Sequence, residues 1–420
     1  MTIYLSDRLS TPVIGGYEME LIFGKEDVAE AMKAVSKAVG KSPIPILTNV
    51  LISAAYDPLP DLLKATQETD NGIYLAATDL EIGIRASVPG QVIESGAIAL
   101  PAREFASIVR EASHKDVRLV TKSDGKARIE CGSAQFRIAG LPADEFPSLI
   151  PASDSETQPE LMGNAKDKVE PPSISIDSGR LASMIGMTSF AASKDEMRHF
   201  LNGIHLSLRN DSEGDESGCL VTMAATDGTR LAVATARAEG RTEEGKGVIV
   251  PIKAAAQLRN MLPRSDAVKI SIHDSRIAFE AGDTILVSRL IEGEYPDYAK
   301  VIPEESGIKL TIDTQRLLSV CKRVATMANS KLPGVKIEAT GEILRMSSST
   351  PEYGEAYEEM QIRKEGDDVG IALNVRYLMD ALRVIQTEEM IVGIEAPLKP
   401  VLMRPACDNG YLYVLMPVRL

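Results

Sequence analysis

The sequence predicts an α+β fold built from three similar domains in tandem. The first observation is an alternation of amphipathic helical segments with groups of short strands, which recurs along the whole chain. The second is a repeated Ala-Thr-Asp motif, at 77–79 and again at 225–227, with alternating apolar residues on both sides. The third is length, because 420 residues suit about three domains.

Six segments have apolar residues at helical spacing: 25–41, 101–115, 177–194, 251–264, 313–331 and 374–386. Asp177, Asp313 and Asn374 stand at helix starts, where their side chains cap free backbone N–H groups. Pro101 and Pro251 suit a first helical turn. The chain therefore supplies two helices to each of the three domains.

Strands follow each helix in small antiparallel groups. The clearest is 224–234, where Asp227-Gly228 is flanked by alternating apolar residues, as in a tight hairpin. Other alternating segments are 49–54, 117–121, 127–131, 134–138, 203–208, 268–272, 276–280, 284–290 and 411–417. We therefore expect each domain to pack two helices against two antiparallel sheets.

Domain boundaries follow from a third repeated landmark and from composition. The segment 141–147 resembles 291–297, and each closes a copy of the unit. The stretch 152–172 is rich in Ser, Glu, Asp and Pro, which is typical of a linker. The predicted organisation is an N-terminal extension (1–16), domain one (17–151), the linker (152–172), domain two (173–301) and domain three (302–420), with polar inserts at 57–71 and 210–218.

Composition favours a cytoplasmic protein without a metal or cofactor. The chain has no apolar run long enough for a membrane span and no secretory signal pattern near Met1. The Cys residues are spaced too widely for a zinc knuckle, so reduced core thiols are expected. The four His residues are likewise scattered. The Cys residues are Cys131, Cys219, Cys321 and Cys407.

Charge is distributed unevenly. The net charge is −14, yet the six predicted helices hold 18 Lys and Arg against 8 Asp and Glu. Basic helices gathered on one surface would bind a polyanion, while the acidic remainder repels it elsewhere. The alternative, ordinary basic residues on solvated helix faces, stays open on charge alone.

Motifs for catalysis are incomplete. The segment 240–247 nearly matches a phosphate-binding loop, but Gly247 stands where a Ser or Thr would bind magnesium. Ser319 and Lys322 have Ser-x-x-Lys spacing without a supporting motif. The alternative function, an enzyme of repeated α+β domains, would need a nucleotide, metal or triad signature.

Several motifs together identify a family. They are Pro45-Ile-Leu-Thr-Asn49, Leu141-Pro-Ala-Asp-Glu-Phe-Pro147, Arg198-His-Phe-Leu-Asn-Gly203, Ala225-Thr-Asp-Gly-Thr-Arg-Leu-Ala232, Tyr295-Pro-Asp-Tyr298 and Tyr413-Val-Leu-Met-Pro-Val-Arg-Leu420. The chain resembles the bacterial DNA polymerase III β subunit, the replication sliding clamp, from about Tyr17 to Leu420.

The resemblance implies the DNA-clamp fold, closed into a ring as a head-to-tail homodimer. Its helices would line a hole around double-stranded DNA and contact phosphates without sequence specificity. The implied role is a non-catalytic processivity factor of the DNA polymerase III holoenzyme that needs no cofactor and no membrane. Its partners would be the replicative polymerase, the clamp loader and repair polymerases, which dock through short peptide motifs.

The resemblance also implies three sets of site residues. The partner-peptide pocket would comprise Arg198, Leu201, Thr226, Gly228, Thr229, Arg230, Leu231, Pro296, Lys300, Val301, Pro400, Val414, Leu415, Met416, Pro417 and Val418. DNA contacts would come from Lys33, Lys37, Lys41, Arg110, His199, Phe200, Lys253, Arg259, Lys322 and Arg383. The dimer interface would join Phe136 and Ile138 to Thr326 and Met327.

Two pocket positions depart from the family pattern, and one segment has two interpretations. Thr229 stands where many members have His, and Lys300 where Arg is common. Arg230 would be the main polar contact to a bound peptide, while apolar walls would hold Leu or Phe side chains. The segment 414–418 can also be a buried final strand, and both interpretations can hold.

Overall fold

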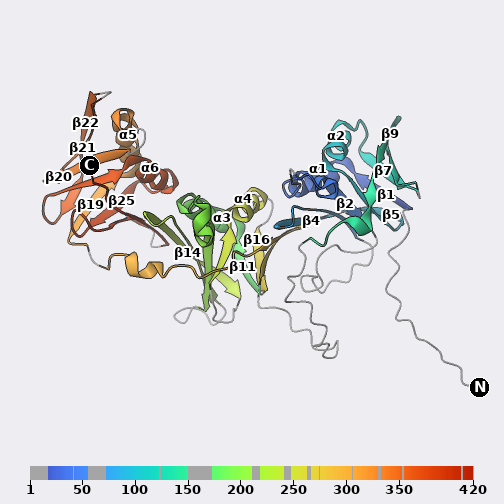
Figure 1. The fold of residues 1–420 in the computed structure, drawn as a ribbon, viewed down its shortest axis with the longest axis horizontal. Helices are drawn as coiled ribbons and strands as arrows, with labels where there is room; N and C mark the ends of the chain where they lie inside the picture. Colours follow the sequence, from blue (N-terminus) through green and yellow to red (C-terminus); the bar gives the residue numbers. More distant parts are fainter. Residues whose placement is uncertain are drawn as a thin grey trace, which may run out of the picture. The chain divides into compact units, whose positions relative to one another are not determined.

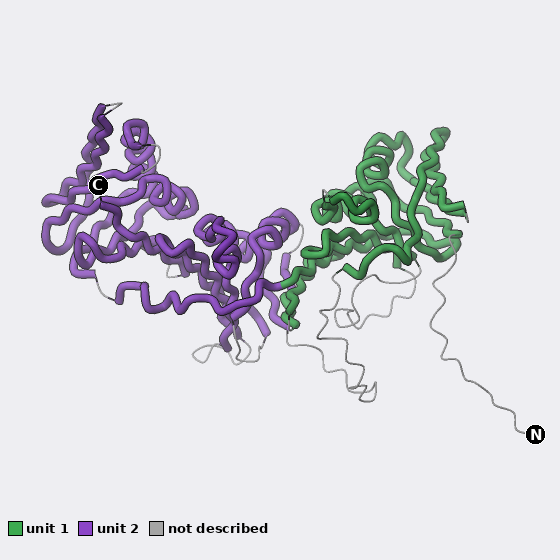
Figure 2. The backbone as a smooth tube through the Cα atoms, viewed as in Figure 1, with its two compact units in different colours: residues 1–171, 270–289 green, residues 172–269, 290–420 purple. Residues whose placement is uncertain are grey.

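The chain folds into two compact units, coloured separately in Figure 2. Unit 1 comprises residues 1–171 and 270–289, and unit 2 comprises 172–269 and 290–420. The computed structural model describes residues 18–40, 42–54, 72–122, 124–149, 173–210, 218–240, 247–262, 266–273, 275–304, 306–329, 333–351, 354–407 and 410–419. The predicted extension, the insert at 57–71 and the linker lie outside the described residues.

Unit 1 contains two antiparallel sheets and two helices (Figure 1). One sheet has the order β5 (Gly90–Glu94), β1 (Met19–Gly24), β7 (Asp116–Thr121), β8 (Lys126–Cys131), β9 (Ala134–Ala139). The other pairs β10 (Leu141–Pro142), β6 (Ala97–Pro101), β2 (Asn49–Ser53), β3 (Ile73–Thr78), β4 (Ile82–Val88), β18 (Thr284–Arg289) and β17 (Arg276–Ala281) in succession. The helices α1 (Lys25–Val35) and α2 (Ala102–Glu111) pack together.

Among the described residues, unit 2 contains one long antiparallel sheet, a second four-stranded sheet and two pairs of α-helices. Its long sheet pairs β15 (Val248–Pro251), β12 (Gly203–Asn210), β13 (Gly218–Thr226), β14 (Arg230–Gly240), β27 (Tyr411–Leu415), β26 (Val401–Pro405), β25 (Glu389–Ile394), β19 (Ile308–Asp313) and β23 (Arg363–Glu365), and β11 (Ser173–Asp177) joins the far end of β14. A second sheet has the order β22 (Gly354–Gln361), β21 (Ile343–Thr350), β20 (Gly334–Thr340), β24 (Val369–Asn374). The strand β16 (Ala267–His273) contains the boundary between the two units.

The helices of unit 2 also pack in pairs. They are α3 (Ser178–Thr188) with α4 (Ile252–Met261), and α5 (Thr314–Val324) with α6 (Val375–Val384). Each buries one apolar face, such as Leu181 and Ile185 of α3. No helix in the described part of the chain is long and apolar enough to cross a membrane.

The helix starts were predicted correctly and the helix ends were not. Asp177, Asp313 and Asn374 are N-caps, and each accepts a hydrogen bond from a backbone N–H of the first turn. Pro101 and Pro251 stand one position earlier than expected, as the N-cap residues themselves. Every described α-helix ends before its predicted end. For α3 and α5 the reason is that the apolar residues that follow belong to 3₁₀ turns, at Ser189–Ala191 and Ala325–Met327.

Candidate partner-peptide site and DNA surface

The turn between β13 and β14 is fixed by its own side chains. Thr226 Oγ1 donates to the Arg230 carbonyl at 2.6 Å and accepts from the Gly228 N–H at 3.0 Å. Asp227 Oδ1 accepts from the backbone N–H groups of Thr229 at 2.9 Å and Arg230 at 3.2 Å. Gly228 has a φ of 91°, which glycine adopts at little cost. The predicted Asp-Gly hairpin is therefore present as a rigid turn.

Three segments that are distant in sequence meet beside this turn. Leu231 on β14 lies opposite Val414 on β27, and Val414 lies opposite Leu402 on β26. Tyr298 and Ile302, from the segment after β18, pack on the same apolar cluster. The sequence predicted this convergence of 226–231, 296–301 and 414–418, and the structure brings the three segments together within unit 2.

Backbone hydrogen bonds hold the segments in place. The Thr226 N–H donates to the Tyr295 hydroxyl at 3.0 Å, and burial raises the pKa of the Tyr295 phenol, so it stays protonated at neutral pH. The Met416 N–H donates to the Thr229 carbonyl at 2.9 Å. The His205 ring stacks on the Tyr295 ring with centroids 4.9 Å apart, and burial lowers the pKa of His205. The site is thus preformed rather than assembled from loose loops.

The predicted pocket residues divide by exposure. Leu201, Leu231, Val414 and Leu415 are buried, and Leu231 and Val414 belong to the apolar cluster beneath the surface. The exposed members include Pro296, Val301, which is 49% exposed, and Met416, which is 40% exposed. Pro400, Pro417 and Val418 are half-buried. Residues 411–415 form a buried strand, and the segment beyond it returns to the surface at Met416.

Arg230, the expected main polar contact to a peptide, has several partners within the chain. Its Nε donates to Asp227 Oδ2 at 2.9 Å, its Nη1 to Asp380 Oδ2 at 2.8 Å and its Nη2 to the Phe190 carbonyl at 2.7 Å. The guanidinium also lies over the Tyr377 ring, 4.0 Å from its centroid, and the side chain is only 9% exposed. Arg230 therefore ties β14 to α6.

The other polar pocket candidates are at the surface. Arg198 Nη1 donates to the Asp227 carbonyl at 3.2 Å, and its Nε donates to Asp195 at 3.1 Å. Lys300 is paired with Asp297 at 3.1 Å and its side chain is 81% exposed. Thr229 is exposed, and its hydroxyl donates to Asp227 Oδ1. The two positions that depart from the family pattern are accordingly open to a partner.

The predicted DNA contacts lie mainly on helices. Exposed examples are Lys33 on α1, Arg110 on α2, Lys253 and Arg259 on α4, Lys322 on α5 and Arg383 on α6. Lys37 is half-buried just after α1, and Lys41 lies outside the described residues. His199 and Phe200 lie outside the six described α-helices. They belong to a 3₁₀ helix (Glu196–Leu201), with their rings edge to face.

Among the described α-helices, only those of unit 2 carry a net positive charge. Over the observed bounds, α1 and α2 carry four Lys and Arg against five Asp and Glu. Helices α3 to α6 carry eight Lys and Arg against a single acid, Asp380. Over the predicted bounds the first two helices hold seven Lys and Arg against five acids and the other four hold eleven against three, so the full difference appears only with the shorter observed helices.

The predicted dimer residues lie at two sheet margins. Phe136 and Ile138 are on β9, the edge strand of its sheet, and Phe136 is 37% exposed. Thr326 and Met327 form the 3₁₀ turn that follows α5. That turn contacts β22, an edge strand of unit 2 that carries Glu355, Glu358 and Glu359.

Comparison with known proteins covers nearly the whole chain. Models of the DNA polymerase III beta subunit match residues 19–150 as its N-terminal domain, 175–297 as its central domain and 299–419 as its C-terminal domain. The beta sliding clamp of Synechocystis sp. is 31% identical over 425 residues, which covers 96% of this chain and 100% of the relative. That of Chlamydia muridarum is 28% identical over 96% of this chain and 99% of the relative.

Solved structures agree. The C. crescentus beta sliding clamp has a TM-score of 0.81 and 30% identity, and the Thermotoga maritima DNA polymerase III beta subunit has a TM-score of 0.78 and 28% identity. Each comparison covers 96% of this chain and 100% of the other. Fold and site together define a three-domain clamp subunit of a replicative polymerase, which confirms the predicted fold class. The chain belongs to the DNA polymerase III beta subunit family, the beta sliding clamps, which are non-catalytic processivity factors.

Proposed function

We propose that this protein closes into a head-to-tail homodimeric ring around double-stranded DNA and tethers the replicative polymerase to it. The observation that carries the proposal is the match of all three clamp domains in order along one chain. A ring holds DNA by topology, so its helices need only weak, sequence-neutral phosphate contacts and can slide. We expect a protein with this role in the cytoplasm. Its three domains would comprise residues 17–151, 173–301 and 302–420.

We propose that the site beside the Thr226 turn receives short peptide motifs of the polymerase, the clamp loader and repair polymerases. Two relatives support this. The C. crescentus clamp has polyethylene glycol in the region assigned to beta-motif tethering, and a Pseudomonas aeruginosa clamp binds griselimycin. In this chain a buried apolar cluster lies under the exposed Val301 and Met416. One or two buried anchors in such a groove contribute about 2 kcal/mol or more each.

Removing residues 416–420 tests the peptide site. The deletion removes the Met416 hydrogen bond to Thr229 and one apolar wall, while the strand β27 stays intact. Calorimetry with a polymerase-tail peptide should show binding to the full chain and none to the shortened chain, with both proteins dimeric. Unchanged affinity after the deletion would contradict this assignment.

We propose that β9 of one subunit meets β22 and the Ala325–Met327 turn of its partner. Unpaired edge strands are covered in stable assemblies, and pairing them would leave neither edge free. β9 offers Arg137 and Phe136, and the other surface offers Glu355 and Met327, while Glu358 and Glu359 are paired with Arg323 and Arg345. Met327→Asp would place an unpaired charge in the contact and should yield monomers at low micromolar concentration by light scattering. A dimeric mass for this variant would show that the interface lies elsewhere.

The ring itself is tested on DNA of two topologies. The protein is loaded by its clamp loader on nicked circular DNA and separated from free protein by gel filtration. We expect it to stay with the circle and to leave after the circle is cut once. Retention on the linear product, or equal loss from both, would contradict encirclement.

A further inference from the structure

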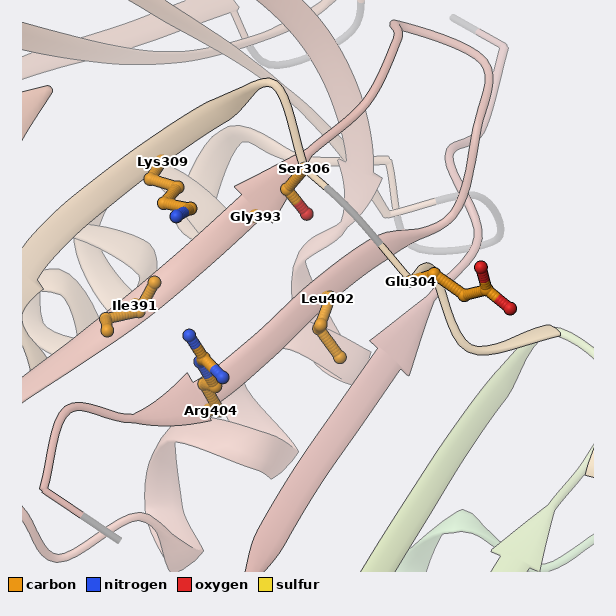
Figure 3. A pocket seen from close by; sticks show the side chains of 7 residues that line it. All are labelled: Glu304, Ser306, Lys309, Ile391, Gly393, Leu402 and Arg404. Atoms are coloured by element: carbon orange, nitrogen blue, oxygen red, sulfur yellow. The ribbon is translucent and has the colours of Figure 1, made fainter. Parts of the chain in front are cut away.

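A hollow opens on the long sheet of unit 2, next to the candidate peptide site (Figure 3). Its volume is about 360 Å³. The floor is formed by Ile391 on β25 and Leu402 on β26, and the sides are formed by Lys309, Arg404, Ser306 and Glu304. A side chain at Gly393 would collide with Ser306, so the glycine keeps the hollow open beneath that residue.

The hollow contains two cations that have no acidic partner among the described residues. Lys309 and Arg404 are exposed, and within the described part of the chain neither makes an ion pair. Glu365 lies opposite Lys309 on β23, yet the two form no ion pair in the described residues. Figure 3 shows the Glu304 carboxylate at the far end of the hollow, away from both cations. The field between Lys309 and Arg404 therefore favours an anion.

One row of residues joins the hollow to the peptide site. Lys309 is opposite Gly393, Gly393 is opposite Leu402, Leu402 is opposite Val414, and Val414 is opposite Leu231. Neighbouring strands are about 4.8 Å apart, so Lys309 lies three strand spacings, roughly 14 Å, from Val414. An extended peptide covers that distance in about four residues. Leu402 belongs to both surfaces, which are continuous.

We propose that this hollow is a basic subsite of the partner-peptide site, which binds an acidic side chain of the peptide. It takes an Asp or Glu carboxylate of the same peptide, about four residues from the apolar anchor, between Lys309 and Arg404. This proposal rests on the proposed peptide binding at the Thr226 turn. Its consequence is a ranking of partners, because those with an acid at this spacing gain affinity over those without one.

The test uses a polymerase-tail peptide, the same peptide with a Glu-Glu pair about four residues from its apolar cluster, on either side, and a matched Gln-Gln pair. Calorimetry at low salt compares the full chain, the double variant K309Q and R404Q, and the control K336Q, which removes an exposed lysine of β20 on the other sheet of unit 2. We expect the Glu peptide to bind the full chain and K336Q about fivefold to tenfold more tightly than the Gln peptide. The double variant should bind both equally.

Two results would overturn the proposal. The first is equal affinity of the Glu and Gln peptides for the full chain, while the unmodified peptide still binds. This result leaves the peptide site itself standing. The second is a Glu advantage that persists in the double variant. If the unmodified peptide fails to bind the full chain, the proposed peptide function and the basic subsite both fall.

Discussion

The turns after β3 and after β13 are built by the same hydrogen bonds. In unit 1, Thr78 Oγ1 donates to the Ile82 carbonyl at 3.0 Å, and Asp79 Oδ1 accepts from two backbone N–H groups further along the turn. Thr226 and Asp227 repeat each contact in unit 2. The strand after each turn then pairs with a strand from much later in the chain, β4 with β18 and β14 with β27.

The two turns differ in what covers them. In unit 1 the single hydroxyl proton of Thr78 is shared between the Ile82 carbonyl at 3.0 Å and the Leu149 carbonyl at 2.7 Å, and Leu149 packs so closely on Gly83 that no side chain fits there. In unit 2 Leu231 follows the turn, and Gly228 and Thr229 stay exposed. The first copy is sealed by its own chain, whereas the second presents a surface to another molecule. Repetition of a fold thus need not repeat its function.

The largest expected effect is a loss of stability on replacing the residue that follows the turn in unit 2. Arg230→Ala should cost about 2–3 kcal/mol of unfolding free energy, because it removes three hydrogen bonds of the guanidinium and leaves Asp227 without its cation, while Asp380 keeps Arg383. Urea unfolding followed by circular dichroism measures the loss. Arg198→Ala is the control, since that side chain is 47% exposed and its removal should cost less than about 1 kcal/mol. Equal losses would mean that Arg230 does not brace the turn.

The backbone of the two turns gives the next effect. Gly228 has a φ of 91° and Leu80 a φ of 76°. A leucine in unit 1 therefore adopts the left-handed backbone conformation that a glycine adopts in unit 2. Gly228→Ala should cost about 1–2 kcal/mol, while Leu80→Gly should gain up to about 1 kcal/mol by relieving strain. The same unfolding assay measures both variants. A loss on Leu80→Gly would show that packing of the leucine outweighs its strained backbone.

Basic residues on the helices of unit 2 should contribute more to DNA binding than those on the helices of unit 1. Replacing Arg259 and Lys322 by Gln should lower the slope of log affinity against log salt by roughly 2, one for each phosphate contact. Replacing Lys33 and Arg110 by Gln should lower it less, because five acids surround them on α1 and α2. Fluorescence anisotropy on a short duplex at several salt concentrations measures both slopes. Equal changes in the two slopes would show that the charge difference between the helices of the two units does not affect DNA binding.

The smallest effect is a pH dependence that originates at His205. Burial lowers the pKa of His205 from its ordinary value of 6.5, so the unfolded chain takes up a proton below that pH and the folded chain does not. Stability should therefore fall as the pH drops below 6.5, and be unaffected by His205 above it. The variant His205→Phe keeps the stacking on Tyr295 and should show a shallower fall between pH 6.5 and 5. Identical pH profiles would exclude His205 as a source.

Sequence reasoning reached the fold because its signals are local. Capping by Asp177 and Asn374 and the Asp-Gly turn each involve neighbours in sequence. It could not find the partner of Arg230, because Asp380 lies on a helix 150 residues further on. The hollow between Lys309 and Arg404 was equally invisible, since it depends on the register of three strands. The specific site residues for peptide, DNA and dimer stay predictions.

The pairing of β14 with β27 has a consequence for how the chain acquires its peptide site. Partners such as Arg230 and Leu415 are far apart in sequence, so closing this ladder costs more chain entropy than forming either hairpin alone. Contacts of such long range form slowly. During refolding the helices and local hairpins should therefore appear before the protein can capture a peptide. A freshly made subunit would then be structured for an interval in which it cannot yet recruit a polymerase.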